Sequence, residues 1–123
     1  MSKRILIVDD IDFILEFESK VIESLSKEVH QPIKVDAANS VGEALKMIEA
    51  HTYDAMVLDM NLPDGTGIDI AKAAQAKSEE TRIAALTIYP QKIEQDLTYF
   101  DAFFKKPILP SIYKENLRKL LQL

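Results

Sequence analysis

The sequence predicts a doubly wound α/β domain, in which helices cover both faces of one parallel sheet. Four short apolar runs, each ending in a polar residue, have the length and composition of strands buried on both faces. Amphipathic patterns with helical spacing lie between them, so strands and helices alternate five times along 123 residues. A chain of this length fits one compact domain, and we take residues 1–123 as that domain.

Five segments are expected to form the strands. The apolar runs at 5–8, 55–58, 83–86 and 102–104 predict buried strands, and the last of these is the shortest and is aromatic. The segment 33–37 alternates apolar and polar residues instead, which is typical of a half-exposed strand at the edge of a sheet.

Five helices are expected between and after these strands. Ser40 and Glu43 form a capping-box pattern that predicts the start of the second helix. Pro90 and Pro110 suit the first position of the fourth and fifth helices, where a proline costs no hydrogen bond. The expected inward-facing residues, in helix order, are Ile14, Phe17, Val21 and Leu25; Ala44, Leu45 and Ile48; Ile68, Ala71 and Ala74; Ile93 and Leu97; Tyr113, Leu117, Leu120 and Leu121.

The composition is that of a soluble, acidic, intracellular domain. The chain has 15 Lys and Arg against 20 Asp and Glu, a net charge of -5, which disfavours direct binding of nucleic acid. No apolar stretch approaches the ~20 residues of a membrane span, and the start of the chain does not resemble a signal peptide. The absence of cysteine excludes disulfides and thiolate chemistry and is compatible with a cytoplasmic location.

Polar residues follow four of the expected strands, where an α/β sheet binds its ligands. Asp9 and Asp10 follow the first strand, Asp59 the third, Thr87 the fourth and Lys106 the fifth. Clustered carboxylates repel one another unless a cation neutralises them, and Mg²⁺ suits a site with few carboxylates. With an ammonium and a hydroxyl nearby, such a site would accept a phosphoryl group, and one aspartate would be the nucleophile. Which side chains meet depends on strand order, which these patterns do not determine.

Each of these residues also has a plain structural explanation. An aspartate after a strand usually belongs to a turn or helix cap, and a lysine pair before a proline is usually solvated. Their joint placement at four strand ends favours the functional interpretation.

Taken together, the motifs resemble the receiver domain of two-component response regulators. The matching segments are Val8-Asp9-Asp10, Leu58 to Gly67, Leu86-Thr87 and Phe103 to Pro107, and the likeness extends over essentially the whole chain. The resemblance implies a flavodoxin-like fold with strand order 2-1-3-4-5 and five helices.

The resemblance also implies a role for each matching residue. Asp59 would take a phosphoryl group from the phosphohistidine of a histidine kinase. Asp9, Asp10 and Asp59 would bind Mg²⁺ together with the backbone carbonyl of Asn61. Gly67 would allow the loop after the third strand a tight exit.

Three further positions are implied to act after phosphorylation. Lys106 would pair with the acyl phosphate, Thr87 would hydrogen-bond a phosphate oxygen, and Phe103 would be the aromatic switch. The residue after Thr87 is usually small in this family, whereas Ile88 and Tyr89 stand here. Since bulky side chains at the pocket restrict attacking water, we expect a long-lived phosphoryl state. Lys105 is expected to point away from the site.

The implied partners are a sensor histidine kinase or phosphotransfer protein, and a downstream output domain or protein. In the family the first helix helps to dock the phosphoryl donor, a role that an exposed Phe13 or Ile14 would suit; both residues lying in the core is the alternative. Phosphorylation often leads to homodimers in the family. The chain would be a signalling domain rather than an enzyme, with only autocatalytic phosphorylation and dephosphorylation.

Three alternatives remain to be weighed against this interpretation. A degenerate receiver would act as a phosphorylation-independent binding module. A haloacid-dehalogenase-like phosphatase would carry a second carboxylate where Asn61 stands. A flavodoxin-like carrier would need a phosphate-binding loop after the first strand, where Asp9, Asp10 and Asp12 would repel a phosphate instead.

Overall fold

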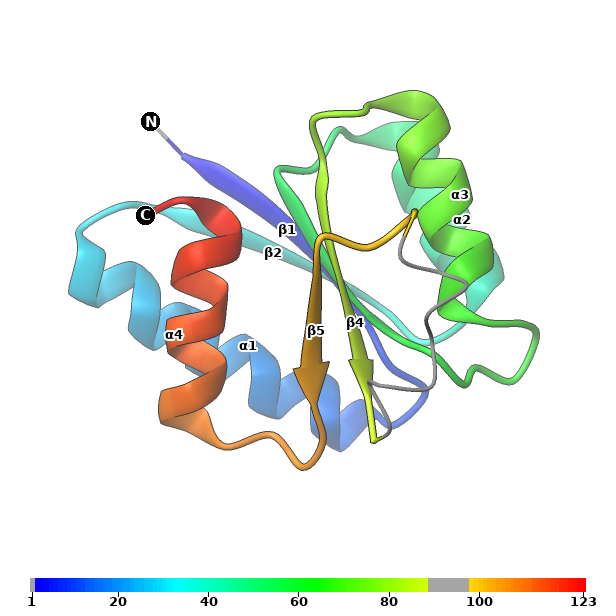
Figure 1. Ribbon diagram of the computed structural model, residues 1–123. Helices are drawn as coiled ribbons and strands as arrows, with labels where there is room; N and C mark the ends of the chain where they lie inside the picture. Colours follow the sequence, from blue (N-terminus) through cyan, green and yellow to red (C-terminus); the bar gives the residue numbers. More distant parts are fainter. Residues whose placement is uncertain (1, 89–97) are drawn as a thin grey trace.

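The computed structural model of the chain describes residues 2–88 and 98–123 and shows a parallel five-stranded sheet with helices on both faces (Figure 1). The strand order is β2-β1-β3-β4-β5, and every neighbouring pair is parallel. This confirms the doubly wound fold and the strand order that the resemblance implies. The strands are β1 Lys3–Val8, β2 Ile33–Ala38, β3 Ala55–Asp59, β4 Arg82–Thr87 and β5 Ala102–Lys105.

The described residues contain four helices, which are α1 Asp12–Val29, α2 Val41–Ala50, α3 Gly67–Lys77 and α4 Pro110–Leu121. These correspond to the first, second, third and fifth of the predicted helices. The predicted fourth helix, which would begin at Pro90 and carry Ile93 and Leu97, lies outside the described residues. No helix in the described ranges has the length and apolar character required to cross a membrane.

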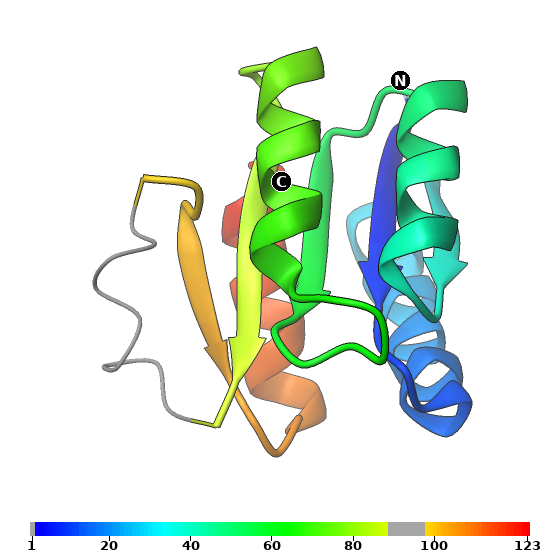
Figure 2. The same cartoon turned by 90° about the vertical axis from the view of Figure 1, so that its right-hand side faces the viewer.

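The helices form two layers, with α1 and α4 on one face of the sheet and α2 and α3 on the other (Figures 1 and 2). Successive side chains of β1 point to opposite faces of the sheet, so this strand contributes to both apolar cores. Ile5 and Ile7 belong to the apolar core beneath α1 and α4, whereas Leu6 and Val8 belong to the core beneath α2 and α3. As predicted, β2 is a half-buried edge strand.

Side-chain caps mark the start of α2 and α3. The Ser40 hydroxyl accepts a hydrogen bond from the Glu43 amide (3.1 Å), which confirms the predicted start of α2. A complete capping box, which the sequence reading did not predict, joins Thr66 and Asp69 at the start of α3. Pro110 stands in the first turn of α4, and the four residues predicted to face inward on this helix are all buried.

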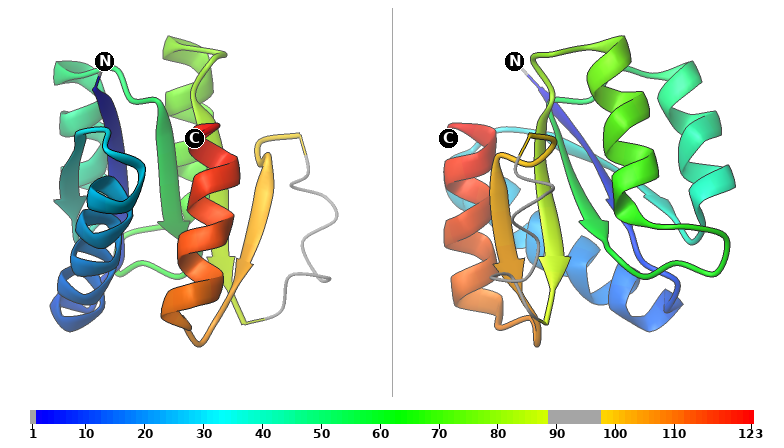
Figure 3. Two further views of the ribbon diagram at one scale, coloured as in Figure 1. Left: turned by 90° about the vertical axis from the view of Figure 1, so that its left-hand side faces the viewer. Right: turned by 45° about the vertical axis from the view of Figure 1, so that its right-hand side comes forward.

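The carboxyl ends of all five strands lie at one edge of the sheet, because the strands are parallel (Figure 3). The two termini of the chain lie toward the opposite edge (Figure 2). The residues that directly follow β1, β3, β4 and β5 therefore lie at the carboxyl edge, where open α/β sheets bind their ligands.

Candidate functional site

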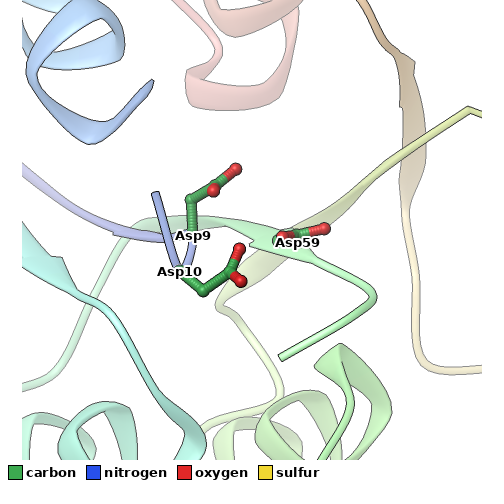
Figure 4. A group of neighbouring side chains, drawn as sticks. All are labelled: Asp9, Asp10 and Asp59. Atoms are coloured by element: carbon green, nitrogen blue, oxygen red, sulfur yellow. The ribbon is translucent and has the colours of Figure 1, made fainter. Parts of the chain in front are cut away.

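Three aspartates from two strands meet at the carboxyl edge of the sheet. Asp9 and Asp10 directly follow β1, and Asp59 is the last residue of β3. Because β1 and β3 pair in register, with Val8 opposite Leu58, residues fifty positions apart become neighbours. One oxygen from each carboxylate lies within 4.8 Å of the other two (Figure 4). The predicted cluster is therefore present.

The cluster is electrostatically unfavourable without a cation. Asp9 is fully buried and Asp59 almost so, while Asp10 is exposed. Burial raises the pKa of Asp9; the Ile11 amide, which donates a hydrogen bond to Asp9 Oδ1 (3.0 Å), opposes this rise, and the charge of Asp59 adds to it. Asp9 Oδ2 is buried without a hydrogen-bond partner. An orphaned carboxylate oxygen in such a place suits a metal ligand.

Lys106 supplies one ammonium to this group of carboxylates. Its Nζ lies 3.1 Å from Asp59 Oδ1 and 3.8 Å from Asp9 Oδ2, and its side chain is half-buried. Its backbone amide donates to the Thr87 carbonyl (3.0 Å), which ties the loop after β5 to the end of β4. The Lys106–Pro107 peptide bond is cis. Lys105, next to it, is exposed, as the strand alternation predicts.

The donor set fits Mg²⁺, a hard ion that prefers a few carboxylate oxygens and retains water. Asp9, Asp10 and Asp59 offer three such oxygens, and the exposure of Asp10 leaves the site open to solvent on that side. The backbone amide of Asn61 donates to Asp59 Oδ1 (3.3 Å), so the loop that would supply the Asn61 carbonyl begins folded against the site.

That loop is held close to β3 and to α2. A Cβ at Gly67 would lie 2.8 Å from the Asp59 carbonyl oxygen, so only glycine allows α3 to begin so near the strand, in agreement with the predicted tight exit. Asp64 accepts hydrogen bonds from the amides of Val41 (2.8 Å) and Gly42 (3.0 Å) at the start of α2, and these bonds lower its pKa. The sequence reading did not assign this anchor to Asp64.

The two predicted switch residues lie on the neighbouring strands. Thr87 ends β4, one residue beyond Leu86, which pairs with Asp59. Phe103 lies on β5 opposite Ala85, is half-buried, and packs against Phe100 with ring centroids 5.8 Å apart. Thr87 thus ends the strand next to Asp59, whereas Phe103 lies one strand farther out, at the edge of the sheet.

An exposed apolar groove borders the site on the α1 side. Phe13 is 74% exposed, and Ile88 and Ile11 are more than half exposed, so Phe13 is not a core residue. Ile14 is half-buried. Lys106 is the one charged residue of the groove lining, whose apolar residues are Ile11, Phe13, Ile14, Phe17, Ile88, Pro107 and Ile108.

Sequence reasoning also missed a buried carboxyl group near the site. Glu18 on α1 is fully buried and interacts electrostatically with Asp9, Asp59 and Lys106. A signal was present, because Glu18 falls four residues after Ile14 and three before Val21, within the inward-facing stripe.

Comparison with known proteins agrees with this geometry. Residues 5–121 match the family described as Response regulator receiver domain. The chemotaxis protein CheY of Pseudomonas aeruginosa is 26% identical, over 97% of this chain and 96% of that protein. The acid tolerance regulatory protein ActR of Rhizobium meliloti is 30% identical over 72% of this chain, but the match spans only 42% of ActR.

Solved structures show the same likeness. A CheY-like receiver domain protein from Methanospirillum hungatei JF-1 superposes with a TM-score of 0.84, at 26% identity and with 99% of this chain and 95% of that chain covered. The response regulator protein TrrA of Thermotoga maritima, solved in complex with Mg²⁺-BeF, has a TM-score of 0.77 at 29% identity, with coverage of 96% and 98%.

Proposed function

The chain belongs to the response regulator receiver domain family, and we propose that it accepts a phosphoryl group on Asp59 from the phosphohistidine of a histidine kinase or phosphotransfer protein. The observation that carries the proposal is the convergence of Asp9, Asp10, Asp59 and Lys106 at one strand edge. On this proposal residues 1–123 act as one signalling domain that works in the cytoplasm, where the kinase phosphorylates it.

The transfer step uses groups that the fold already holds in place. A carboxylate oxygen of Asp59 attacks the phosphorus, the bond from phosphorus to the imidazole nitrogen breaks, and the electron pair leaves with the imidazole. Asp59 Oδ1 already accepts from Lys106 and from the Asn61 amide, so its other oxygen, Oδ2, would be the nucleophile. Lys106 would then stabilise charge on the transferred group, since phosphoryl transfer depends mainly on positioning and electrostatics.

Asp9, Asp10, Asp59 and the Asn61 carbonyl would hold Mg²⁺, which when bound neutralises charge between carboxylates and phosphate. A hydrogen bond from the Thr87 hydroxyl to the phosphoryl group would then pull the end of β4 toward Asp59. Phe103 would follow into the space behind Thr87 and carry the change to the β5 surface, where an output partner or a second copy would bind.

The test of this proposal is phosphorylation by acetyl phosphate in the presence of Mg²⁺, read by intact mass. A single adduct is expected for the wild type, and none without Mg²⁺ or with Asp59→Asn, which keeps the side-chain shape but removes the nucleophile. If neither acetyl phosphate nor a panel of autophosphorylated histidine kinases gives an adduct, the chain is the phosphorylation-independent binding module instead.

The apolar groove supports a phosphohistidine protein as the natural donor. Its exposed Phe13 and Ile11 lie on α1 and just before it, and Lys106, which contacts Asp59, also lines it, so a helix seated there would present its phosphohistidine to Asp59. Phe13→Ser should therefore slow transfer from an autophosphorylated kinase and leave the rate with acetyl phosphate unchanged. Equal slowing with both donors would place the fault in the site and refute the groove as the docking surface.

A further inference from the structure

Glu18 is a buried acid that the proposed reaction does not use. It lies on α1 with no exposed surface, and the Tyr113 hydroxyl on α4 donates a hydrogen bond to its Oε1 (2.5 Å). Its other oxygen, Oε2, is buried without a hydrogen-bond partner. Within residues 2–88 and 98–123, no lysine, arginine or histidine forms a salt bridge with Glu18. A carboxylate so enclosed is costly to ionise.

The neighbours of Glu18 divide into apolar walls and the charged groups of the site. The β1 and β2 side chains packed under α1 are apolar, and the seam with α4 is apolar around Tyr113. The titratable groups that act on Glu18 are Tyr113, Asp9, Asp59 and Lys106. Three of these four belong to the phosphorylation site.

A second polar contact crosses the same helix pair farther along. Lys114 Nζ on α4 reaches Ser24 Oγ and Glu28 Oε1 on α1, each at 3.0 Å. That pair is partly exposed, whereas Glu18 and Tyr113 are enclosed. In the described part of the chain, the α1–α4 seam thus includes a solvated polar contact at Lys114 and a buried one at Glu18, and the charges of the site act on Glu18.

Burial raises the pKa of Glu18 to about 8. The hydrogen bond from Tyr113 lowers it, because a donor favours the carboxylate form; the charge of Asp9 raises it, and that of Lys106 lowers it. Burial also raises the pKa of Tyr113, with the charge of Glu18 as the next cause, so the tyrosine remains a donor. At neutral pH Glu18 is thus mainly protonated.

We propose that Glu18 is a positioning residue of the phosphorylation site: as an uncharged acid it joins α1 to α4 through Tyr113, and losing its proton adds a fourth carboxylate charge to the field of Asp9, Asp10 and Asp59. The ionised form favours the bound divalent cation and disfavours the incoming phosphoryl group. Proton occupancy of Glu18 thereby changes the affinity of the site for the cation and its attraction for the phosphoryl group in opposite directions. This inference rests on the proposed function, because it assumes a metal at the three aspartates.

The reciprocity of binding equilibria gives this inference a direct test. If ionised Glu18 strengthens Mg²⁺ binding, then Mg²⁺ must lower the pH at which Glu18 titrates, by the same free energy. The experiment is carbon-13 NMR of the glutamate side-chain carboxyl carbons of the whole chain, titrated with and without Mg²⁺. Glu18→Gln, which keeps the shape and remains uncharged, assigns the Glu18 signal.

We expect the Glu18 signal to titrate above neutrality and its midpoint to fall when Mg²⁺ is added. Tyr113→Phe should raise the midpoint, since it removes the donor that favours the carboxylate. Calorimetry should find Mg²⁺ affinity equal in wild type and Glu18→Gln at about pH 6.5, and roughly fivefold tighter in wild type at about pH 9. A merely structural Glu18 would not produce this pH-dependent difference.

Two results would overturn the inference. If the Glu18 carboxyl signal titrates in the ordinary pH range of glutamate, then Glu18 is charged at neutral pH and has partners other than those described here. A midpoint that Mg²⁺ does not move, while calorimetry still detects binding, would show that Glu18 does not act on the site. If calorimetry detects no Mg²⁺ binding by the wild type and no difference between it and Asp10→Asn, that result would instead refute the proposed function.

Discussion

Two groups of carboxylates on the same sheet differ in how completely their neighbours satisfy them. Asp36 on β2 accepts hydrogen bonds from Arg4 Nε (3.1 Å) and from the Tyr53 hydroxyl (2.7 Å). At the carboxyl edge, Asp9 and Asp59 share one lysine with each other, and Asp9 Oδ2 has no hydrogen-bond partner. Both groups combine acidic residues with a basic one, so composition does not distinguish them.

The difference indicates that incomplete pairing, rather than acidity, marks the functional site. The group around Asp36 is complete in the folded chain: Asp54, directly before β3, likewise accepts the Arg4 backbone amide (2.8 Å). On the proposed function, the group around Asp59 would become complete only when a cation and a phosphoryl group bind. Evolution tolerates such a cost in stability where the missing partner is a ligand.

The largest effect should come from removing Lys106, the cation that the described residues place in the incomplete group. Lys106→Met is expected to slow phosphorylation by acetyl phosphate roughly 10²- to 10³-fold, the usual loss for one preorganised donor. Lys105→Met is the matched control, because Lys105 is adjacent and exposed and should leave the rate unchanged. Quench-flow or timed intact-mass measurements would decide. Equal rates in the two variants would mean that Lys106 only balances charge in the resting state.

Glu18 is an intermediate case, a buried carboxyl with one partner, and should make stability depend on pH. Its folded pKa of about 8 exceeds its unfolded value, so the folded chain binds more protons between the two. The free energy of unfolding should therefore fall as pH rises through that window, by up to about 1.4 kcal/mol per pH unit. Urea unfolding of wild type and Glu18→Gln across this range would measure it, and the variant should lose this slope. The same dependence of unfolding free energy on pH in both proteins would contradict the prediction.

Replacing aspartate by asparagine should change the free energy of unfolding in opposite directions in the two groups. Asp36→Asn should lower the free energy of unfolding by about 1–3 kcal/mol, since it weakens two hydrogen bonds to a charged group. Asp9→Asn should raise it by about 1 kcal/mol at neutral pH, because it removes a buried charge in a like-charged cluster. The pKa of Asp9 is raised in the folded chain, so the destabilisation by its buried charge appears as pH rises above the ordinary pKa of an aspartate. The stability gained in Asp9→Asn should therefore vanish in acid, where Asp9 is protonated in both the folded and the unfolded chain.

Added Mg²⁺ is the control for that pair of variants. It should stabilise the wild type and Asp36→Asn by binding only the folded state, and should stabilise Asp9→Asn much less. Denaturation curves of the three proteins with and without Mg²⁺ would give all six free energies of unfolding. A loss of stability in Asp9→Asn without Mg²⁺ would show that the Asp9 carboxylate is already satisfied, and would remove the contrast between the two groups.

The sequence allowed the fold and the main site to be predicted because their signals are local. Each buried strand is a continuous apolar run, and each site residue directly follows one, so the parallel sheet brings Asp9, Asp59 and Lys106 to one edge. Strand order has no such local signal, and it came only from the family resemblance. Pro90 and the helix it was predicted to begin lie outside the described residues.

Contacts between distant segments explain what the sequence did not show. Glu18 falls on the inward stripe of α1, but its partner Tyr113 is 95 positions away. Asp64 looks like an ordinary turn residue until α2, 22 and 23 positions earlier in the chain, presents its first amides to it. A local pattern can show that a polar residue is buried, but only the tertiary arrangement shows what pairs with it.

The smallest expected effect concerns how long the phosphoryl group remains once the incomplete group is filled. Ile88 follows Thr87, is 58% exposed, and lines the same groove as Lys106, so its side chain stands beside the site on the solvent side. Ile88→Ala should therefore shorten the lifetime of phospho-Asp59 by a few-fold, because water reaches the phosphorus more often.

Ile112→Ala, at a similarly exposed isoleucine on α4 that does not line this groove, is the control. The measurement is decay of the intact-mass adduct after donor removal. If both variants match the wild type, the stability of the adduct depends on the charged groups alone; Tyr89, the other bulky residue noted at this position, lies outside the described residues.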